Sequence, residues 1–276
     1  MRVKEKLKEL DVKASKSRGQ NFVINDSLID SIMNFASLNE SENIVEIGPG
    51  LGALTKELYK IKNDIKVIEI EEKFANDLKQ RFPKLEVINK DVREVDFSEL
   101  GDNLTVFGNI PYSFSTDIIF HLIAYAPYIN RAILLLQKEF AMRLAASPST
   151  KSYGALSVAC QLWAEPCLGD IFPGNFFHPP AKVDSQVIEL KFYKEKKFNV
   201  KDSFWLQRFV KACFSQRRKK LINSLKSTSI FPIDKLEKAF VEANIDPNRR
   251  AETLSIEEFI TLSEIFGKIL DDIERR

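Results

Sequence analysis

Four consecutive residues, Asn109-Ile110-Pro111-Tyr112, offer the most specific chemistry in the sequence. The Asn109 side-chain oxygen and the Ile110 main-chain carbonyl can each accept an N–H hydrogen bond. Pro111 fixes the local turn, and the Tyr112 ring can stack on a planar base. An exocyclic amine is a poor nucleophile because its lone pair is delocalised into the ring. The tetrapeptide is therefore predicted to hold such an amine with its lone pair facing an electrophile. Taken alone, four such residues fit a structural turn with a proline better than a binding site; their position after a strand, a glycine loop and two acids favours the site.

A glycine-rich loop lies upstream of this tetrapeptide. The segment 44–55 (IVEIGPGLGALT) places Gly48, Gly50 and Gly52 between a predicted strand and a predicted helix. Glycine lets the backbone turn tightly and approach a ligand closely. Glu69 follows about twenty residues later, where a carboxylate can bind the hydroxyls of a ribose. The pattern predicts a nucleotide site, but the loop alone does not separate a dinucleotide from S-adenosylmethionine.

Two further acidic residues favour S-adenosylmethionine. Glu46 lies inside the predicted strand, two residues before the first glycine, where methyltransferases commonly keep an acid. Asp91 follows the third predicted strand and can accept a hydrogen bond from an adenine amino group. A helix N-cap or a loop acid is the structural alternative for Asp91.

The elements that must position these residues alternate between strands and helices. Amphipathic stretches at 51–59 and 72–81 separate short aliphatic runs, and each run is long enough for a strand buried on both faces. This alternation predicts an α/β fold with a doubly wound, mostly parallel sheet. Residues 185–192 alternate polar and apolar side chains, as an added edge strand does. The aliphatic runs are residues 44–47, 65–70, 85–88, 105–107 and 133–136.

The character of the chain changes at residues 193–202, which are charged and poor in aliphatic side chains. We expect a linker there, separating a domain of residues 1–195 from a helical domain of residues 196–276. Asp234 with Glu237, and Ser255 with Glu258, are typical of helix starts. Residues 203–233 contain no Asp or Glu, and this favours contact with RNA phosphates over a merely solvated helix face. The cations of this stretch are Arg208, Lys211, Arg217, Arg218, Lys219, Lys220 and Lys226.

Composition excludes several classes of protein. The formal net charge of +2 rules out a uniformly basic coat, although not a local basic surface. The three cysteines and two histidines form no CxxC pair or Cys/His cluster, so neither a metal site nor a disulfide framework is expected. The N-terminal segment has no apolar core of a signal peptide, and no apolar run is long enough to span a bilayer. We expect a cytoplasmic protein without a membrane partner.

With these motifs in order, the sequence resembles the KsgA family. Its members are dimethyltransferases that modify two adjacent adenosines near the 3′ end of small-subunit ribosomal RNA. The resemblance covers nearly the whole chain. It rests on KSRGQNFVIN (16–25), VEIGPGLGALT (45–55), VIEIEEKFA (67–75), NIPYSFST (109–116), QKEFAMRL (137–144), YGALSV (153–158), FFHPPAKVDS (176–185), FSQRRKKL (214–221) and IDPNRRAETLSIEEF (245–259).

The resemblance implies a Rossmann-like class I methyltransferase domain and a small C-terminal all-α domain. It implies S-adenosylmethionine as the methyl donor, without a metal, and a monomer acting on rRNA in a partly assembled small subunit. Phe177 is implied as a second ring that sandwiches the target adenine with Tyr112; from the residues alone, it could equally be a core phenylalanine. Arg217, Arg218, Lys219 and Lys220 are expected to contact RNA. Donor contacts are implied for Asn21, Val23, Gly48, Glu69, Asp91 and Asn109.

Two positions depart from the family pattern. Ile110 stands where the family usually has leucine, and isoleucine is frequent there in large-subunit rRNA methyltransferases that confer macrolide resistance. Ala181 stands where a proline is usual, and we expect its loss of a φ constraint to loosen the loop that holds Phe177. The alternatives that stay open are therefore a large-subunit methyltransferase and a ribosome-assembly factor that uses this fold without catalysis.

Overall fold

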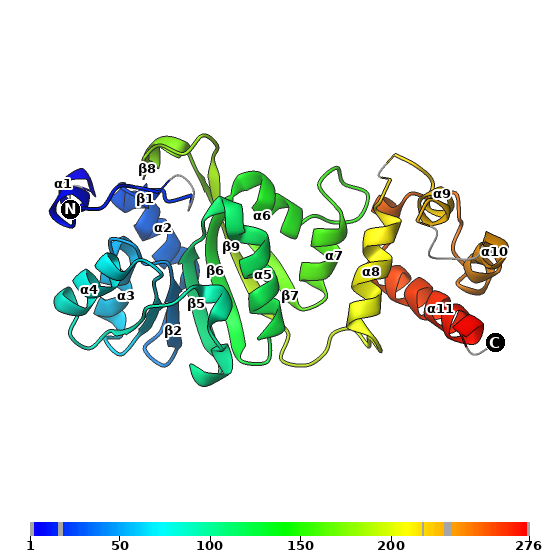
Figure 1. The fold of residues 1–276 in the computed structure, drawn as a ribbon, viewed down its shortest axis with the longest axis horizontal. Coiled ribbons are helices and arrows are strands. Elements are labelled where there is room, and N and C mark those ends of the chain that lie inside the picture. Colours follow the sequence, from blue (N-terminus) through cyan, green and yellow to red (C-terminus); the bar gives the residue numbers. More distant parts are fainter. Residues whose placement is uncertain (1–2, 16–18, 217, 229–232, 275–276) are drawn as a thin grey trace. The chain divides into compact units, whose positions relative to one another are not determined.

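The computed structural model describes residues 3–15, 19–216, 218–228 and 233–274, and it contains two compact units (Figure 1). Unit 1 comprises Met1–Ala141 with Ala164–Lys194, and unit 2 comprises Met142–Trp163 with Glu195–Arg276. The division between residues 194 and 195 lies within the expected linker, residues 193–202. The predicted division into residues 1–195 and 196–276 nevertheless assigns residues 142–163 to the first domain. They belong to unit 2, because their apolar side chains pack in its core.

Unit 1 is built on a sheet of seven strands among the described residues, in the order β4-β3-β2-β5-β6-β9-β7. The strands β4, β3, β2, β5 and β6 run parallel, as the sequence predicts. Antiparallel pairing joins β9 to β6 and to β7. The bounds are β2 Asn43–Ile47, β3 Lys66–Ile68, β4 Glu86–Ile88, β5 Leu104–Asn109, β6 Ile129–Gln137, β7 Ala164–Phe172 and β9 Ser185–Phe192.

The expectation that residues 185–192 form an edge strand is wrong. This strand, β9, lies inside the sheet, and the edge is β7, which the sequence reasoning missed. The polar residues that suggested a solvent-facing side are buried with partners: Glu189 accepts a hydrogen bond from Arg131 at 3.1 Å, and Gln186 donates to the Gly169 carbonyl at 3.0 Å. The strand β7 contains Pro166 and Gly169, which argue against a strand in sequence but are tolerated at a sheet edge.

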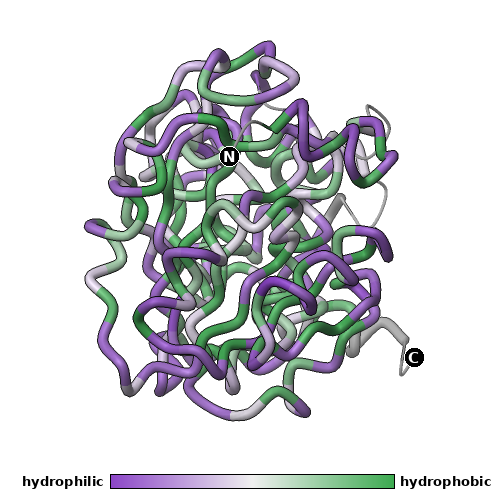
Figure 2. The backbone as a smooth tube through the Cα atoms, turned by 90° about the vertical axis from the view of Figure 1, so that its left-hand side faces the viewer, coloured by the Kyte–Doolittle hydropathy of each residue, from purple (hydrophilic) through white to green (hydrophobic). Residues whose placement is uncertain are grey.

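Helices cover both faces of this sheet. Val106 and Phe107 are consecutive residues of β5 and both are 0% exposed, so both faces of the strand are buried. Apolar segments accordingly fill the interior, and hydrophilic ones lie in outer turns (Figure 2). Residues 22–23 and 177–178 form a separate antiparallel pair, β1 Phe22–Val23 with β8 Phe177–His178. The helices of this part are α1 Val3–Glu9, α2 Asp26–Ala36, α3 Ala53–Ile61, α4 Glu72–Arg81, α5 Ser115–Ala124 and α6 Lys138–Leu144.

Unit 2 is helical where it is described. Its core includes Phe209 and Cys213 of α8, and the predicted capping box holds the start of α11. There the Ser255 amide donates to Glu258 at 2.8 Å, and the Glu258 amide donates to the Ser255 hydroxyl at 3.2 Å. The side chain of Asp234, the other predicted cap, lies outside the described residues. Within the described ranges, no helix is both long and apolar enough to cross a membrane. The helices are α7 Ala155–Gln161, α8 Ser203–Cys213, α9 Leu221–Lys226, α10 Ile233–Glu242 and α11 Ile256–Glu274.

Candidate active site

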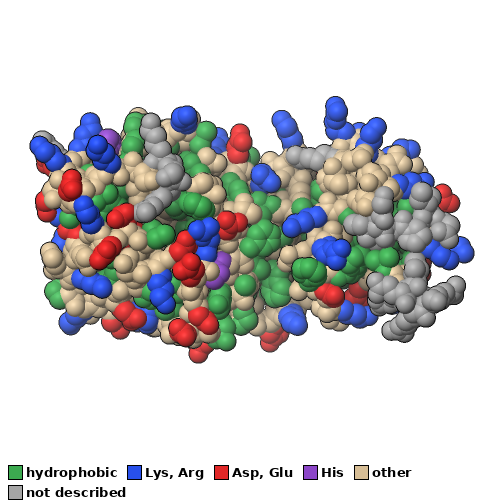
Figure 3. All heavy atoms as spheres, viewed as in Figure 1, with side chains coloured by type: hydrophobic (Ala, Val, Ile, Leu, Met, Phe, Trp, Pro, Cys, Tyr) green, Lys and Arg blue, Asp and Glu red, His purple; other side chains and the backbone are tan. Residues whose placement is uncertain are grey.

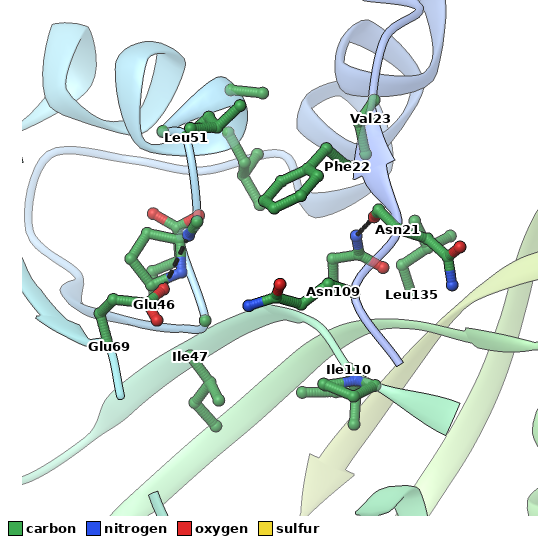
Figure 4. A pocket seen from close by; sticks show the side chains of 18 of the residues that line it. Asn21, Phe22, Val23, Glu46, Ile47, Leu51, Glu69, Asn109, Ile110 and Leu135 are labelled. Atoms are coloured by element: carbon green, nitrogen blue, oxygen red, sulfur yellow. Dashed lines mark hydrogen bonds between the residues drawn. The ribbon is translucent and has the colours of Figure 1, made fainter. Parts of the chain in front are cut away.

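A cavity of about 630 Å³ lies at the carboxyl ends of β2, β3 and β5, where open α/β sheets bind their ligands (Figure 4). Its size suits a nucleotide-sized molecule. The two residues of β1 line it opposite the glycine loop, and the Phe22 ring faces its middle. Of the predicted site residues, Asn21, Val23, Gly48, Glu69, Asp91, Asn109, Ile110, Pro111 and Tyr112 all line this cavity.

The glycine loop presents open backbone to the cavity. Gly48 has a φ of +63°, which side-chain-bearing residues rarely adopt. A Cβ built on Gly48 has no neighbouring atom within 4 Å, so the space beside it is available to a ligand. The loop thus has the geometry that close approach of a ligand requires.

Glu69 is held in place by the backbone around it. Its carboxylate accepts hydrogen bonds from the Gly50 and Glu71 amides, each at 2.9 Å, and its side chain is almost completely buried. These two donors fix the carboxylate at the end of β3, beside the glycine loop. A carboxylate fixed there can receive the hydroxyls of a ribose.

Glu46 is a buried acid that lacks a hydrogen-bond partner at one oxygen. It is 3% exposed, and its Oε2 atom has no partner among the described residues. Burial raises the pKa of Glu46 to about 8; the adjacent charge of Glu69 adds to this, and the Thr55 hydroxyl opposes it. Both acids lie on the same side of the cavity (Figure 4). An orphaned carboxylate oxygen in this place can accept a hydrogen bond from a ligand, particularly a cationic one.

Asp91 has the structural role that was its alternative interpretation. It caps the short 3-10 helix Val92–Glu94 by accepting from the Arg93 amide at 3.0 Å, and it forms an ion pair with the Arg93 guanidinium at 2.6 Å. These hydrogen bonds lower the pKa of Asp91 below its ordinary value. The carboxylate still lines the cavity, so its contact with an adenine amino group stays a prediction.

The amide of Asn109 has a fixed orientation. Its Nδ2 atom donates to the main-chain carbonyl of Asn21 at 2.9 Å, across 88 positions of sequence (Figure 4). Because the nitrogen is committed to that carbonyl, the Oδ1 atom points the other way and can accept. The Ile110 amide donates to the Leu135 carbonyl at 3.1 Å, and the Ile110 side chain is buried, which anchors the loop to β6.

Tyr112 is tethered at its hydroxyl. The Tyr112 and Ser185 hydroxyl oxygens lie 2.6 Å apart, and Ser185 is the first residue of β9. Burial raises the pKa of Tyr112 above its ordinary value, so the hydroxyl is neutral at physiological pH. Tyr112 is half-buried and lines the same cavity as Asn109, so the stacking and hydrogen-bonding residues of the tetrapeptide share one site.

Phe177, predicted to stack on the base, does not line the cavity in this conformation. Its side chain is 1% exposed and packs in the core with Leu135 and Val187. Phe177 belongs to β8, which pairs with β1 at Val23. A ring so buried cannot reach a base without a rearrangement, so stacking by Phe177 stays a prediction. The sequence reasoning also missed Phe22, which lines the cavity and contacts Phe74 edge-on with ring centroids 5.6 Å apart. Its position between two predicted site residues was the available signal.

Comparison with known proteins decides between a dinucleotide enzyme and a methyltransferase. The model of the family described as ribosomal RNA adenine dimethylase matches residues 12–268. The chain belongs to this family. It is 39% identical over 273 residues to a ribosomal RNA small subunit methyltransferase A of Clostridioides difficile, covering 96% of this chain and 94% of that protein. A protein of the same name from Acinetobacter baylyi is 39% identical over 263 residues, covering 93% and 94%.

Two solved structures share the architecture. A dimethyladenosine transferase from Plasmodium falciparum superposes with a TM-score of 0.78 at 25% identity, covering 90% of this chain and 98% of that one. The 23S rRNA methyltransferase ErmE superposes with a TM-score of 0.66 at 25% identity, covering 90% and 100%. The class I methyltransferase fold predicted from sequence is confirmed.

The loop of this dimethylase that follows Phe177 has a backbone hydrogen bond at Ala181, and the loosening expected from the loss of proline there stays a prediction. The Ala181 amide donates to the Gly174 carbonyl at 2.9 Å, a bond that a proline at this position would lack. The two backbones are so close that a Cβ on Gly174 would lie 2.0 Å from the Ala181 carbonyl oxygen. This hydrogen bond restrains the Ala181 backbone in the absence of a proline ring.

The basic segment of unit 2 is exposed where it is described. Arg218, Lys219 and Lys220 are exposed, whereas Arg217 lies outside the described residues. Lys and Arg side chains gather along one margin of this unit on the face shown in Figure 3. Arg249 of the same unit is engaged internally: it forms a bidentate pair with Glu258, including an Nη2–Oε2 hydrogen bond of 2.9 Å.

Proposed function

We propose that this protein uses S-adenosylmethionine to dimethylate N6 of two adjacent adenosines near the 3′ end of small-subunit rRNA. Family membership and the small-subunit relatives support the reaction and the substrate. The observation that carries the chemistry is the Asn109 amide, anchored through Nδ2 to Asn21 with Oδ1 left to accept.

The cavity fits the proposed donor. The Glu69 carboxylate suits the ribose hydroxyls, and Asp91 suits the adenine amino group. The orphaned Oε2 atom of Glu46 provides an acceptor for a cationic part of the donor, while the open backbone at Gly48 leaves room for it. S-adenosylmethionine, when bound, supplies an electrophilic methyl group on a sulfonium.

The protein residues contribute orientation. The Asn109 Oδ1 atom and the Ile110 carbonyl accept the two N–H bonds of the flipped-out base, so the nitrogen lone pair faces the methyl group. Tyr112 stacks on the base. As the nitrogen gains positive charge during transfer, the same two oxygens stabilise it, and its proton then passes to solvent. An amine carrying one methyl keeps one N–H, which one acceptor still orients for the second transfer.

The likeness to ErmE is a specific reason to keep large-subunit rRNA as a second candidate substrate, because the fold and the identity of 25% are shared with it. Mass spectrometry of both large rRNAs from cells with and without the protein tests the choice. We expect two dimethyladenosines near the 3′ end of the small-subunit rRNA only when the protein is present. Loss of methylation from the large-subunit rRNA instead would contradict the proposal.

A purified assay separates catalysis from a purely assembly-related role. Small subunits from the deficient strain, incubated with tritiated S-adenosylmethionine, should take up label with the wild-type protein and none with Asn109→Ala. Replacing Arg218, Lys219 and Lys220 by glutamine should weaken subunit binding and flatten its salt dependence, with the slope falling by roughly 0.7–0.9 for each phosphate that the variant no longer neutralises. The partly assembled subunit, the monomeric state and the cytoplasmic location stay predictions.

A further inference from the structure

Ser185 holds a fixed place beside the tetrapeptide. It is 0% exposed and lies at the start of β9, paired with Gln137 of β6 on one side and Phe172 of β7 on the other. Ladders on both sides keep this end of the strand rigid. Tyr112 has weaker local support, because it belongs to a three-residue 3-10 turn, Tyr112–Phe114. The hydroxyl contact of 2.6 Å therefore ties a short turn to the interior of the sheet.

This contact restrains the orientation of the Tyr112 ring, because it holds the far end of the side chain and a phenolic O–H bonds in the plane of its ring. A tyrosine side chain has two main torsions, and the turn restrains only the end attached to the backbone. Hydrogen bonding at the distal hydroxyl restrains the other end. The orientation of the ring matters because a base stacked on it inherits its plane, and the amine must then meet Asn109 and Ile110 in that plane.

We propose that Ser185 is a positioning residue for methyl transfer, acting through the Tyr112 hydroxyl without touching the base. The inference rests on the proposed function and adds to it a residue outside the cavity lining. The hydrogen bond joins two hydroxyls that are 73 residues apart in the sequence. Through it, β9 sets the angle of the Tyr112 ring on which the base stacks.

Two substitutions remove the same hydrogen bond from opposite ends. Ser185→Ala removes the buried hydroxyl, and Tyr112→Phe keeps the stacking ring but lacks its tether. We expect each to lower kcat by roughly 2- to 13-fold, the range that corresponds to the net worth of one hydrogen bond. The dissociation constant for S-adenosylmethionine, measured by calorimetry, should stay within about twofold, because Ser185 does not line the cavity. The double variant should be no slower than the slower single variant.

Controls distinguish positioning from a general loss of stability. Ser263→Ala removes another buried serine hydroxyl, which donates to the Ile260 carbonyl at 2.9 Å in unit 2, and should leave kcat unchanged. If Ser185→Ala does not fold, Tyr112→Phe carries the test, since it leaves β9 intact. Wild-type kcat in both single variants overturns the proposal, and so do defects that multiply in the double variant. A wild-type protein that labels no small subunits would instead refute the proposed function.

Discussion

Glu46 makes a prediction that the stability of the protein can test directly. Raising its pKa from 4.5 to about 8 corresponds to about 5 kcal/mol, at 1.36 kcal/mol for each pH unit. The folded carboxyl keeps its proton up to about pH 8, whereas the unfolded carboxyl loses it near pH 4.5. The folded state therefore binds more protons in this window, and the Glu46 contribution to stability falls as the pH rises through it. Below pH 4.5 the penalty is absent, and above pH 8 it is complete.

Glu46→Gln removes this penalty because an amide of the same shape has no charge to bury. We expect the variant to match the wild-type protein within about 1 kcal/mol at pH 5 and to exceed it by up to about 5 kcal/mol at pH 9. Urea unfolding followed by circular dichroism at the two pH values measures the difference. Tryptophan fluorescence is unsuitable, since Trp163 and Trp205 both belong to unit 2. Glu86→Gln, at a side chain that is 59% exposed, is the matched control.

Donor binding should respond in the opposite direction. At pH 9, where Glu46 is ionised, a neutral amide at position 46 is a poorer partner for a cationic donor than a carboxylate, so S-adenosylmethionine should bind the variant roughly tenfold more weakly, about 1.4 kcal/mol. If Glu46→Gln is more stable than the wild-type protein but binds S-adenosylmethionine more weakly, the acid is retained for function at a cost in stability. A gain in stability that is equal at pH 5 and pH 9, or absent at both, would refute the reasoning about Glu46.

Three further predictions concern other parts of the structure. Asn109→Ala should abolish methyl transfer while leaving the calorimetric affinity for the donor within about tenfold, and full activity would contradict the orienting role. Gly48→Ala should cost about 1 kcal/mol of stability through its φ of +63° and lower donor affinity at least about tenfold, because the new Cβ enters the ligand space. Gly101→Ala, also at a positive φ with open space around it, should lower stability alone. Arg249→Ala should destabilise unit 2 by about 1–2 kcal/mol in urea unfolding followed by tryptophan fluorescence, since it breaks the bidentate pair with Glu258; unchanged stability would show that the pair is energetically neutral.

The sequence determined the parts of the fold that depend on local pattern. The helix expected over residues 72–81 is α4, with the same bounds, and the aliphatic runs are the parallel strands. The chemistry of the tetrapeptide and the glycine loop was also readable, because hydrogen-bonding capacity and backbone freedom are properties of residue types. The placement of the basic residues 218–220 outside the core follows from the same kind of local reasoning.

Tertiary structure alone decided which groups face each other. The interior place of β9 depends on partners for Glu189 and Gln186 that lie in other segments. The burial of Phe177 depends on β1, and the orientation of the Asn109 amide depends on a carbonyl 88 residues away. Local pattern says how polar a side chain is, but burial and hydrogen bonding depend on what the fold brings beside it. For this reason the sequence predicted most of the residues that line the cavity, and the structure determined their orientation.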